Sequence, residues 1–265
     1  MTRPWLIAVL MLVGCQPLRD GPAPTDPAER VLADRIAAAT TLWDDGLLDQ
    51  ADAAVAALER EGIRHPQVRL LRARLLLATE PAAAAVVAEQ LVAEAPTWLE
   101  PRVLLLRAYD ALDRDAAVAS VCADIDRLFP RSAWGPYGQG AAAASQGRWD
   151  DARRFVQEAL RRDPDAVVAL ELAAAVARHD RDPAAERAAL ERIGDLEPRR
   201  AAVWWRLGDL AAADGRLADA ERHRERAWAL DPRPDRARAL AAEADAAGDS
   251  TAAARWRNRA GGRQP

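Results

Sequence analysis

Residues 201–232 carry apolar and small side chains at the spacing of two helices separated by a turn. Trp204 and Leu207 lie three positions apart, as neighbours on one face of a helix do. Gly208 and Ala220, one in each half of the stretch, are small enough to let two helices pack closely. A glycine between the halves supplies the backbone freedom of a tight turn. The pattern predicts an antiparallel helix pair.

Prolines recur along the chain at intervals of 34 residues: Pro96, Pro130, Pro164, Pro198 and Pro232. Because proline cannot continue a helix and disfavours helix in the residue before it, each one predicts the end of the second helix of a pair. One pair cannot bury its apolar face alone, so successive pairs have to stack on one another. A coiled coil is the competing arrangement, but its heptads would not carry proline and glycine at this period.

The helix pair and its 34-residue period resemble the tetratricopeptide repeat (TPR) family. The resemblance covers about residues 30–260. It implies an all-α fold, a right-handed α-solenoid of antiparallel helix pairs, the TPR superhelix. The expected units span residues 32–64, 65–98, 99–132, 133–166, 167–200 and 201–234, followed by a partial repeat or cap at 235–260 and a tail at 261–265.

Several consensus positions of the repeat are filled unusually. The first unit ends late, at His65-Pro66, so its exit turn is expected to be irregular. In the fifth unit Glu186 replaces the alanine expected where the helices of a pair touch, and in the sixth Arg224 replaces an aromatic residue. In the third unit, Cys122 stands at the repeat position that Arg224 fills in the sixth unit. We expect its side chain to pack in the core.

The first sixteen residues, MTRPWLIAVLMLVGCQ, are organised like the start of an exported protein. Nine consecutive apolar residues follow Pro4, a run that fits the core of a secretory signal. The run is too short to span a bilayer, which takes about 20 residues. The segment Leu12-Val13-Gly14-Cys15 then resembles a bacterial lipobox. An ordinary signal peptide that happens to contain a cysteine is the alternative.

The lipobox resemblance implies a signal peptide at residues 1–14, a diacylglyceryl group on the Cys15 thiol and an acyl chain on its amino group. Two or three acyl chains give a stable anchor. The residue after the cysteine is Gln16 and not aspartate. In enterobacterial-type sorting, the absence of aspartate at this position permits transfer to the outer membrane. The proline-rich residues 15–30 predict an extended tether. The expected location is therefore the outer membrane, facing the periplasm.

Composition and motifs argue against several classes of function. All 37 basic residues are arginine and the net charge is −4, whereas nucleic-acid binders usually carry a basic excess. His65, His179 and His223 lie outside any metal-ligand spacing, and His179 and Asp180 are expected to point to different sides of a helix. The sequence has no lysine for a nucleotide-binding P-loop and no GxSxG or SxxK nucleophile motif. We expect no enzymatic activity, no metal, no nucleic-acid partner and no cofactor besides the lipid on Cys15.

The TPR resemblance also implies a binding surface. In that family the first helix of each pair lines a concave groove, and the matching positions here include six candidate partner-binding residues: Arg107, Trp134, Tyr137, Arg178, Trp205 and Asp209. The register places Trp204 in the core and Trp205 in the groove. Aromatic residues and arginine are enriched at binding hot spots. The alternative is that Trp134 and Trp205 pack between repeats.

These features together predict a non-enzymatic, lipid-anchored envelope scaffold that binds a partner protein or peptide segment through the groove. Lipoproteins with similar repeats include pilotins of type IV pili and adaptors of cell-wall hydrolases, so assembly or stabilisation of an envelope complex is the expected role. The alternative is a binder of a non-protein envelope component, such as peptidoglycan or an anionic glycan, through arginines in the groove.

Overall fold

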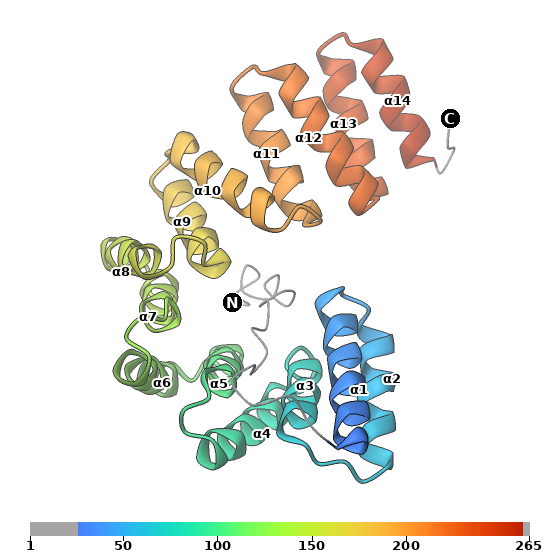
Figure 1. Cartoon of the computed structure of the whole chain (residues 1–265). Helices are drawn as coiled ribbons and strands as arrows, with labels where there is room; N and C mark the ends of the chain where they lie inside the picture. Colours follow the sequence, from blue (N-terminus) through green and yellow to red (C-terminus); the bar gives the residue numbers. More distant parts are fainter. Residues whose placement is uncertain (1–25, 262–265) are drawn as a thin grey trace. The chain divides into compact units, whose positions relative to one another are not determined.

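The computed structural model describes residues 26–261, which form fourteen α-helices and no strand (Figure 1). The chain divides into two compact units, the first ending at Leu172 and the second beginning at Ala173, within α9. The helices are α1 Pro27–Asp44, α2 Leu48–Arg60, α3 Pro66–Leu76, α4 Pro81–Glu94, α5 Leu99–Ala111, α6 Asp115–Leu128, α7 Trp134–Ser145, α8 Trp149–Arg162, α9 Val167–His179, α10 Pro183–Leu196, α11 Ala201–Ala213, α12 Leu217–Leu230, α13 Pro234–Ala246 and α14 Ser250–Ala260. The predicted all-α arrangement of helix pairs is confirmed.

The periodic prolines end the second helices as predicted. The helices α4, α6, α8, α10 and α12 each stop two residues before a proline. The intervening residue leaves the helical conformation: Ala95 has φ −133° and ψ 78°, and Asp163 has φ −143° and ψ 99°. This is the conformation that a following proline favours, because its ring crowds a helical residue before it.

Within residues 26–261, six of the seven turns inside helix pairs use a left-handed residue, and the turn between α3 and α4 does not. Gly46, Gly147, Gly215 and Gly248 have φ between 73° and 78°. In the third and fifth units the corresponding residues are Asp113 (φ 54°) and Arg181 (φ 59°). The left-handed conformation costs an ordinary residue roughly 1–2 kcal/mol. The turn geometry is therefore kept in two pairs that lack the glycine.

We expect Arg181→Gly to raise the free energy of unfolding by about 0.5–1 kcal/mol, because relief of the left-handed strain exceeds the extra chain entropy of glycine. The Arg181 side chain is exposed, so little packing is lost. The matched substitution Gly215→Ala should lower stability by about 1 kcal/mol. Urea unfolding followed by circular dichroism measures both. A destabilised Arg181→Gly variant would contradict the strain.

The N-terminal boundary of the helical region differs from the prediction. Helix α1 begins at Pro27, so the predicted tether over residues 15–30 overlaps its first turn. The side chain of Asp26 caps the helix by accepting a hydrogen bond from the Ala28 amide (2.9 Å), and proline is favourable at a first helical position. We missed this start because the pair of cap and proline lies in a stretch whose other prolines suggested an extended chain.

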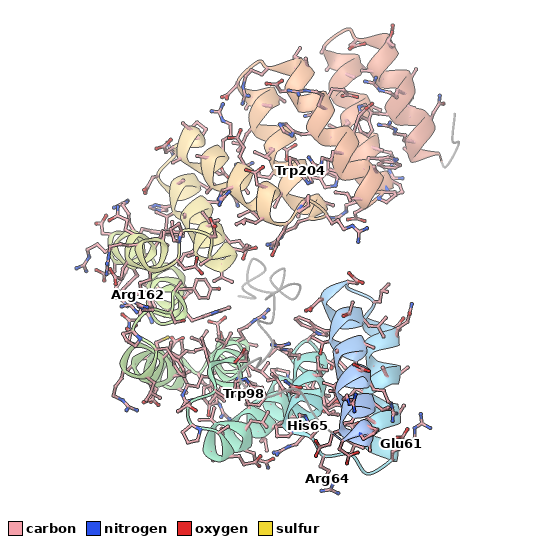
Figure 2. The ribbon with its side chains drawn as sticks, in the orientation of Figure 1. Glu61, Arg64, His65, Trp98, Arg162 and Trp204 are labelled. Atoms are coloured by element: carbon pink, nitrogen blue, oxygen red, sulfur yellow. The ribbon has the colours of Figure 1, made fainter. Side chains whose placement is uncertain are left out.

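The exit from the first helix pair is irregular, as expected. Helix α2 ends at Arg60, and Gly62 is left-handed with φ 78°. His65 then caps α3, because its Nδ1 accepts a hydrogen bond from the Gln67 amide at 3.3 Å (Figure 2). The histidine thus has a structural role at a helix start.

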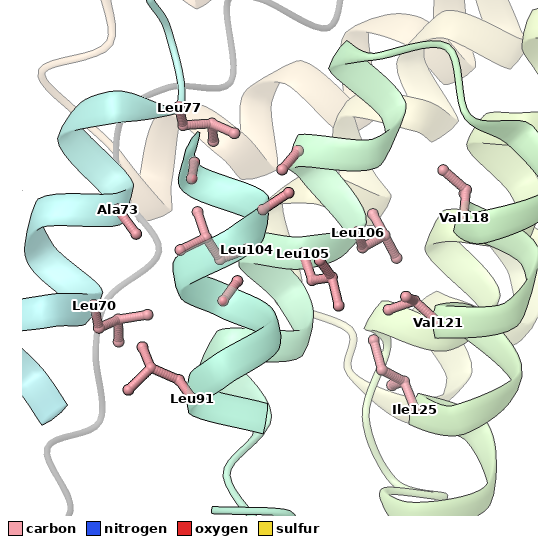
Figure 3. Close-up of a cluster of buried hydrophobic side chains, with 14 of the residues drawn as sticks. Leu70, Ala73, Leu77, Leu91, Leu104, Leu105, Leu106, Val118, Val121 and Ile125 are labelled. Atoms are coloured by element: carbon pink, nitrogen blue, oxygen red, sulfur yellow. The ribbon is translucent and has the colours of Figure 1, made fainter. Parts of the chain in front are cut away.

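The core of the first unit is built from leucine, valine and alanine of α3 to α6. Leu104, Leu105 and Leu106 of α5 are each at most 7% exposed, and Figure 3 shows them with buried residues of α3, α4 and α6 around them. Cys122 is 1% exposed, which confirms its predicted core position. Burial raises the pKa of its thiol to about 12, so the sulfur stays protonated at neutral pH.

Glycines allow α7 to lie against this core. A Cβ atom on Gly138 would collide with the sulfur of Cys122 and lie 2.7 Å from Leu106 Cδ1. A Cβ atom on Gly135 would collide with the carboxylate of Asp126. That carboxylate accepts hydrogen bonds from Gln139 Nε2 and Arg162 Nη1, each at 2.7 Å. The position of α7 is therefore fixed by close contact with α6 and by a polar link to α8.

The second unit has a tryptophan-rich core. Trp204 and Trp205 of α11 and Trp256 of α14 are between 1% and 7% exposed. Small residues at the helix contacts, among them Ala220 and Ala253, are 1% and 0% exposed.

Across residues 26–261, none of the helices has the length and hydropathy of a membrane span.

Candidate functional site

The six predicted groove residues all lie on first helices of pairs, but they fall in two structural units. The first unit holds Arg107 on α5 and Trp134 and Tyr137 on α7, and the second holds Arg178 on α9 and Trp205 and Asp209 on α11. The two groups are therefore described separately. The predicted lipidation residue, Cys15, lies outside the described residues.

The first group contains an aromatic pair, Trp134 and Tyr137, in which the tyrosine is buried. The rings of Trp134 and Tyr137 meet edge to face, with centroids 5.3 Å apart and planes at 88°. Tyr137 is 5% exposed, whereas Trp134 is half-buried and packs against the core of the first unit. The indole is thus the accessible member of the pair, and the phenol supports it. Such edge-to-face contacts hold aromatic rings in a defined orientation.

Charged side chains of neighbouring first helices affect the pKa of the Tyr137 phenol. Burial raises the pKa of Tyr137, and the negative charge of Glu171 on α9 raises it further. Burial lowers the pKa of Arg107, while Tyr137 and Glu171 act in the opposite direction and Arg74 on α3 adds to the lowering. We call these residues, on α3, α5, α7 and α9, the first-helix row: Arg74, Arg107, Trp134, Tyr137 and Glu171.

The second group shows that Trp205 packs inside the protein. Its side chain is 3% exposed, its ring lies 6.4 Å from that of Trp256, and the Arg236 guanidinium lies 5.1 Å from its centroid. Trp204 is 7% exposed and donates from Nε1 to the Pro198 carbonyl at 3.0 Å (Figure 2). The predicted division between a core and a groove tryptophan therefore does not appear in their exposure. The structure favours the alternative that Trp205 packs between repeats.

Arg178 and Asp209 belong to ion pairs between helices. Asp209 Oδ2 accepts from Arg236 Nη2 at 2.9 Å, which links α11 to α13. Arg178 lies against Glu186 of α10, with Nε and Nη2 at 2.8 and 2.7 Å from Oε1. Arg206 of α11 binds the same carboxylate, with Nε 2.8 Å from Oε1 and Nη2 2.8 Å from Oε2. We call Arg178, Glu186 and Arg206 the arginine–glutamate cluster.

Sequence reasoning missed the role of Glu186. Its side chain is only 1% exposed. Burial raises its pKa, but the hydrogen bonds from Arg206 and Arg178 outweigh that effect and hold the pKa below its ordinary value. A signal was present, because a carboxylate stands where the other five full units have alanine or valine. The replacement by itself does not reveal which arginines the carboxylate binds.

The remaining candidates for chemistry have structural surroundings. His179 Nδ1 lies 3.1 Å from Asp180 Oδ1, contrary to the expectation that they point apart. Helix α9 ends at His179, so Asp180 is the first residue beyond the helix. Burial lowers the pKa of His223, whose ring stacks on Trp204 at 5.7 Å. Over residues 26–261, no three His, Cys, Asp or Glu side chains converge as metal ligands.

Solved structures share this arrangement of helix pairs. TTC0263, a thermophilic TPR protein of Thermus thermophilus, matches with a TM-score of 0.57 and 22% identity over 71% of this chain and 97% of its own. This chain has the tetratricopeptide repeat fold. The TPR chain is also similar to PilW, a type IV pilus biogenesis factor (TM-score 0.55, 16% identity, 72% of this chain and 90% of that one). YrrB, a TPR protein with an unusual peptide-binding site, matches with a TM-score of 0.52 and 16% identity, over 68% and 94% of the two chains. By sequence, no family model and no curated protein matches this TPR chain.

Proposed function

We propose that this TPR chain is a non-enzymatic, lipid-anchored scaffold of the bacterial cell envelope that binds another envelope protein or a peptide segment. The first-helix row is the proposed contact surface. The observation that carries the proposal is the half-buried Trp134 ring, held edge to face on the buried Tyr137. An accessible aromatic ring that is already held in place by a buried neighbour loses little conformational freedom when a partner covers it.

The neighbours of Trp134 suit a protein partner. Arg107 is half-buried; burial lowers the pKa of its guanidinium, and Tyr137 and Glu171 act in the opposite direction. Tryptophan and arginine are the residues that most often dominate the energy of protein interfaces. We therefore assign the main contacts to Trp134 and Arg107, with Tyr137 as their support.

The envelope location rests on the N-terminal sequence. The lipobox-like segment ending at Cys15 supports attachment of a diacylglyceryl group to the Cys15 thiol and an acyl chain to its amino group. The proposed role is assembly or stabilisation of an envelope complex, in the manner of a pilotin or a hydrolase adaptor. The similarity to the fold of PilW is compatible with the first of these.

Cys15→Ser is expected to abolish incorporation of radiolabelled palmitate and to leave an unprocessed precursor. The reason is that the hydroxyl of serine does not replace the thiol in lipid transfer or in the cleavage that depends on it. Labelling of cells followed by immunoprecipitation measures both effects, and Cys122→Ser is the matched control, since Cys122 is buried in the core. Normal palmitate labelling of Cys15→Ser would contradict the anchor.

Quantitative capture of partners tests the binding function. Envelopes are solubilised in mild detergent, and proteins recovered with the tagged chain are compared between wild type, Trp134→Ala and Val86→Ala. Val86 is 52% exposed on the second helix α4 and serves as the surface control. At least one envelope protein should be reduced about tenfold or more by Trp134→Ala and not by the control. Equal recovery from both variants would overturn the assignment of the surface.

A further inference from the structure

We infer that Arg178 and Arg206 form a preset clamp for the side-chain carboxylates of an acidic peptide segment in the partner. The inference rests on the proposed protein-binding function and names the chemistry of the partner. The arginines lie on α9 and α11, the first helices of two successive pairs, and both are held by the carboxylate of Glu186 on α10.

The buried glutamate fixes both guanidinium groups. Each arginine directs its Nε and one terminal nitrogen at Glu186, at distances of 2.7 to 2.8 Å. Because the glutamate belongs to α10 and is 1% exposed, its carboxylate sets the orientation of both partners. Side chains that are already oriented lose less entropy when they bind.

The outer edges of the two guanidinium groups remain available. An arginine carries five N–H donors, of which the bonds to Glu186 occupy two on each side chain. Among residues 26–261, neither Arg178 nor Arg206 has another hydrogen-bond acceptor. Their side chains are 55% and 35% exposed. The free donors can therefore meet carboxylate oxygens in the fork geometry that arginine favours.

The charge of the cluster selects an anion. Two arginines share one carboxylate, so the arginine–glutamate cluster carries one excess positive charge. The side chains of a basic segment would be repelled. Charge-assisted bonds from a guanidinium to a carboxylate are about twice as strong as neutral hydrogen bonds.

The presence of Glu186 is better explained by its positioning of Arg178 and Arg206 than by a contribution to the stability of the fold. The equivalent residues of the other full units are small or apolar: Ala51, Ala84, Val118, Ala152 and Ala220. A buried ion pair is often no more stabilising than apolar residues of similar volume. The role of the charged residue at this helix contact is therefore to orient the two arginines.

An acidic peptide fits the surroundings better than an anionic glycan. Sugar rings commonly pack their apolar faces on exposed aromatic rings. The tryptophans next to Arg206 on α11, Trp204 and Trp205, are 7% and 3% exposed and offer no such platform. An extended peptide needs only the outward donors of the clamp.

Fluorescence anisotropy of the purified full-length protein tests the clamp. The probe is a short fluorescein-labelled peptide that alternates glutamate and glycine, and the neutral comparison replaces every glutamate by glutamine. We expect binding of the acidic peptide only, weakened about tenfold or more by Arg178→Gln or Arg206→Gln. Arg181→Gln, an exposed arginine in the adjacent turn, should change the affinity less than about twofold. Thermal melts establish that each variant is folded.

Three outcomes would overturn the inference: unchanged affinity in both arginine variants, equal binding of the neutral peptide, or equally strong competition by an oligogalacturonate, which would indicate glycan binding. The two proposals fail separately. If Trp134→Ala releases an envelope partner but the acidic peptide does not bind, only the clamp is wrong. If the peptide binds the clamp but Trp134→Ala releases no partner, the proposed contact surface is wrong.

Discussion

Replacement of Trp205 by alanine is expected to lower the free energy of unfolding by about 3–5 kcal/mol. The Trp205 side chain is 3% exposed and contacts Trp256 and Arg236, so truncation opens a cavity between α11 and the last helix pair. Urea unfolding followed by far-ultraviolet circular dichroism measures the change. This effect is expected even though Trp205 occupies a position that the repeat register assigns to partner binding.

Trp134→Ala provides the comparison. Its ring is half-buried rather than buried, so we expect a loss of about 1–2 kcal/mol, smaller than at Trp205 because less apolar surface returns to water. The two substitutions should therefore separate stability from binding. A loss below about 1 kcal/mol for Trp205→Ala would show that its ring is solvated.

Glu186→Gln is expected to destabilise the protein by about 2–3 kcal/mol, because two guanidinium groups would share an uncharged amide in place of a carboxylate. The value lies at the lower end for a broken buried ion pair because Arg178 and Arg206 are 55% and 35% exposed and keep part of their hydration. Glu158→Gln is the matched control. Glu158 also binds two arginines, Arg161 and Arg162, but at the surface, so a much smaller change is expected.

The stabilising effect of Glu186 should depend on pH. Its pKa is lower in the folded protein than its ordinary value of 4.5, so the ionised form stabilises the fold above that value. This contribution is lost as the pH falls below 4.5 and through the lower folded pKa. The difference in unfolding free energy between wild type and Glu186→Gln should thus narrow in acid. A constant difference from pH 7 to acid would contradict the ion pairing.

The ends of the helices were predictable because proline and glycine act locally. Pro96 and its four periodic equivalents exclude helix from their own neighbourhood, whatever the tertiary contacts. The start of α1 depended on a single capping aspartate, Asp26, and was missed. Local signals therefore determine most boundaries, and a boundary that depends on one side chain is easily overlooked.

Side-chain exposure could not be derived from the repeat register alone. The register places Trp204 in the core and Trp205 in the groove, but both side chains are buried, with ring contacts to His223 of α12 and Trp256 of α14 respectively. It could not show that Trp256 and Arg236 of the last helix pair cover the Trp205 face. Burial depends on neighbours that are distant in the sequence.

The buried charge of Glu186 is a second feature that could not be predicted from the repeat register alone. A carboxylate at a helix contact is unfavourable for an isolated pair of helices. It becomes favourable only when Arg178 and Arg206, eight residues before and twenty after, reach the same carboxylate. Such a cluster is recognised from three elements together rather than from one position.

Site-specific photocrosslinking in cells tests most directly whether the first-helix row binds an envelope protein. Amine-directed reagents are unsuitable because the sequence has no lysine. A benzoylphenylalanine residue is therefore introduced by Trp134→p-benzoylphenylalanine and, as the control, by Val86→p-benzoylphenylalanine on the exposed surface of α4. The proposed function predicts a discrete protein adduct from position 134 that is absent from position 86 and is reduced by Arg107→Gln. Adducts of equal yield and identity from both positions, or none from position 134, would contradict it.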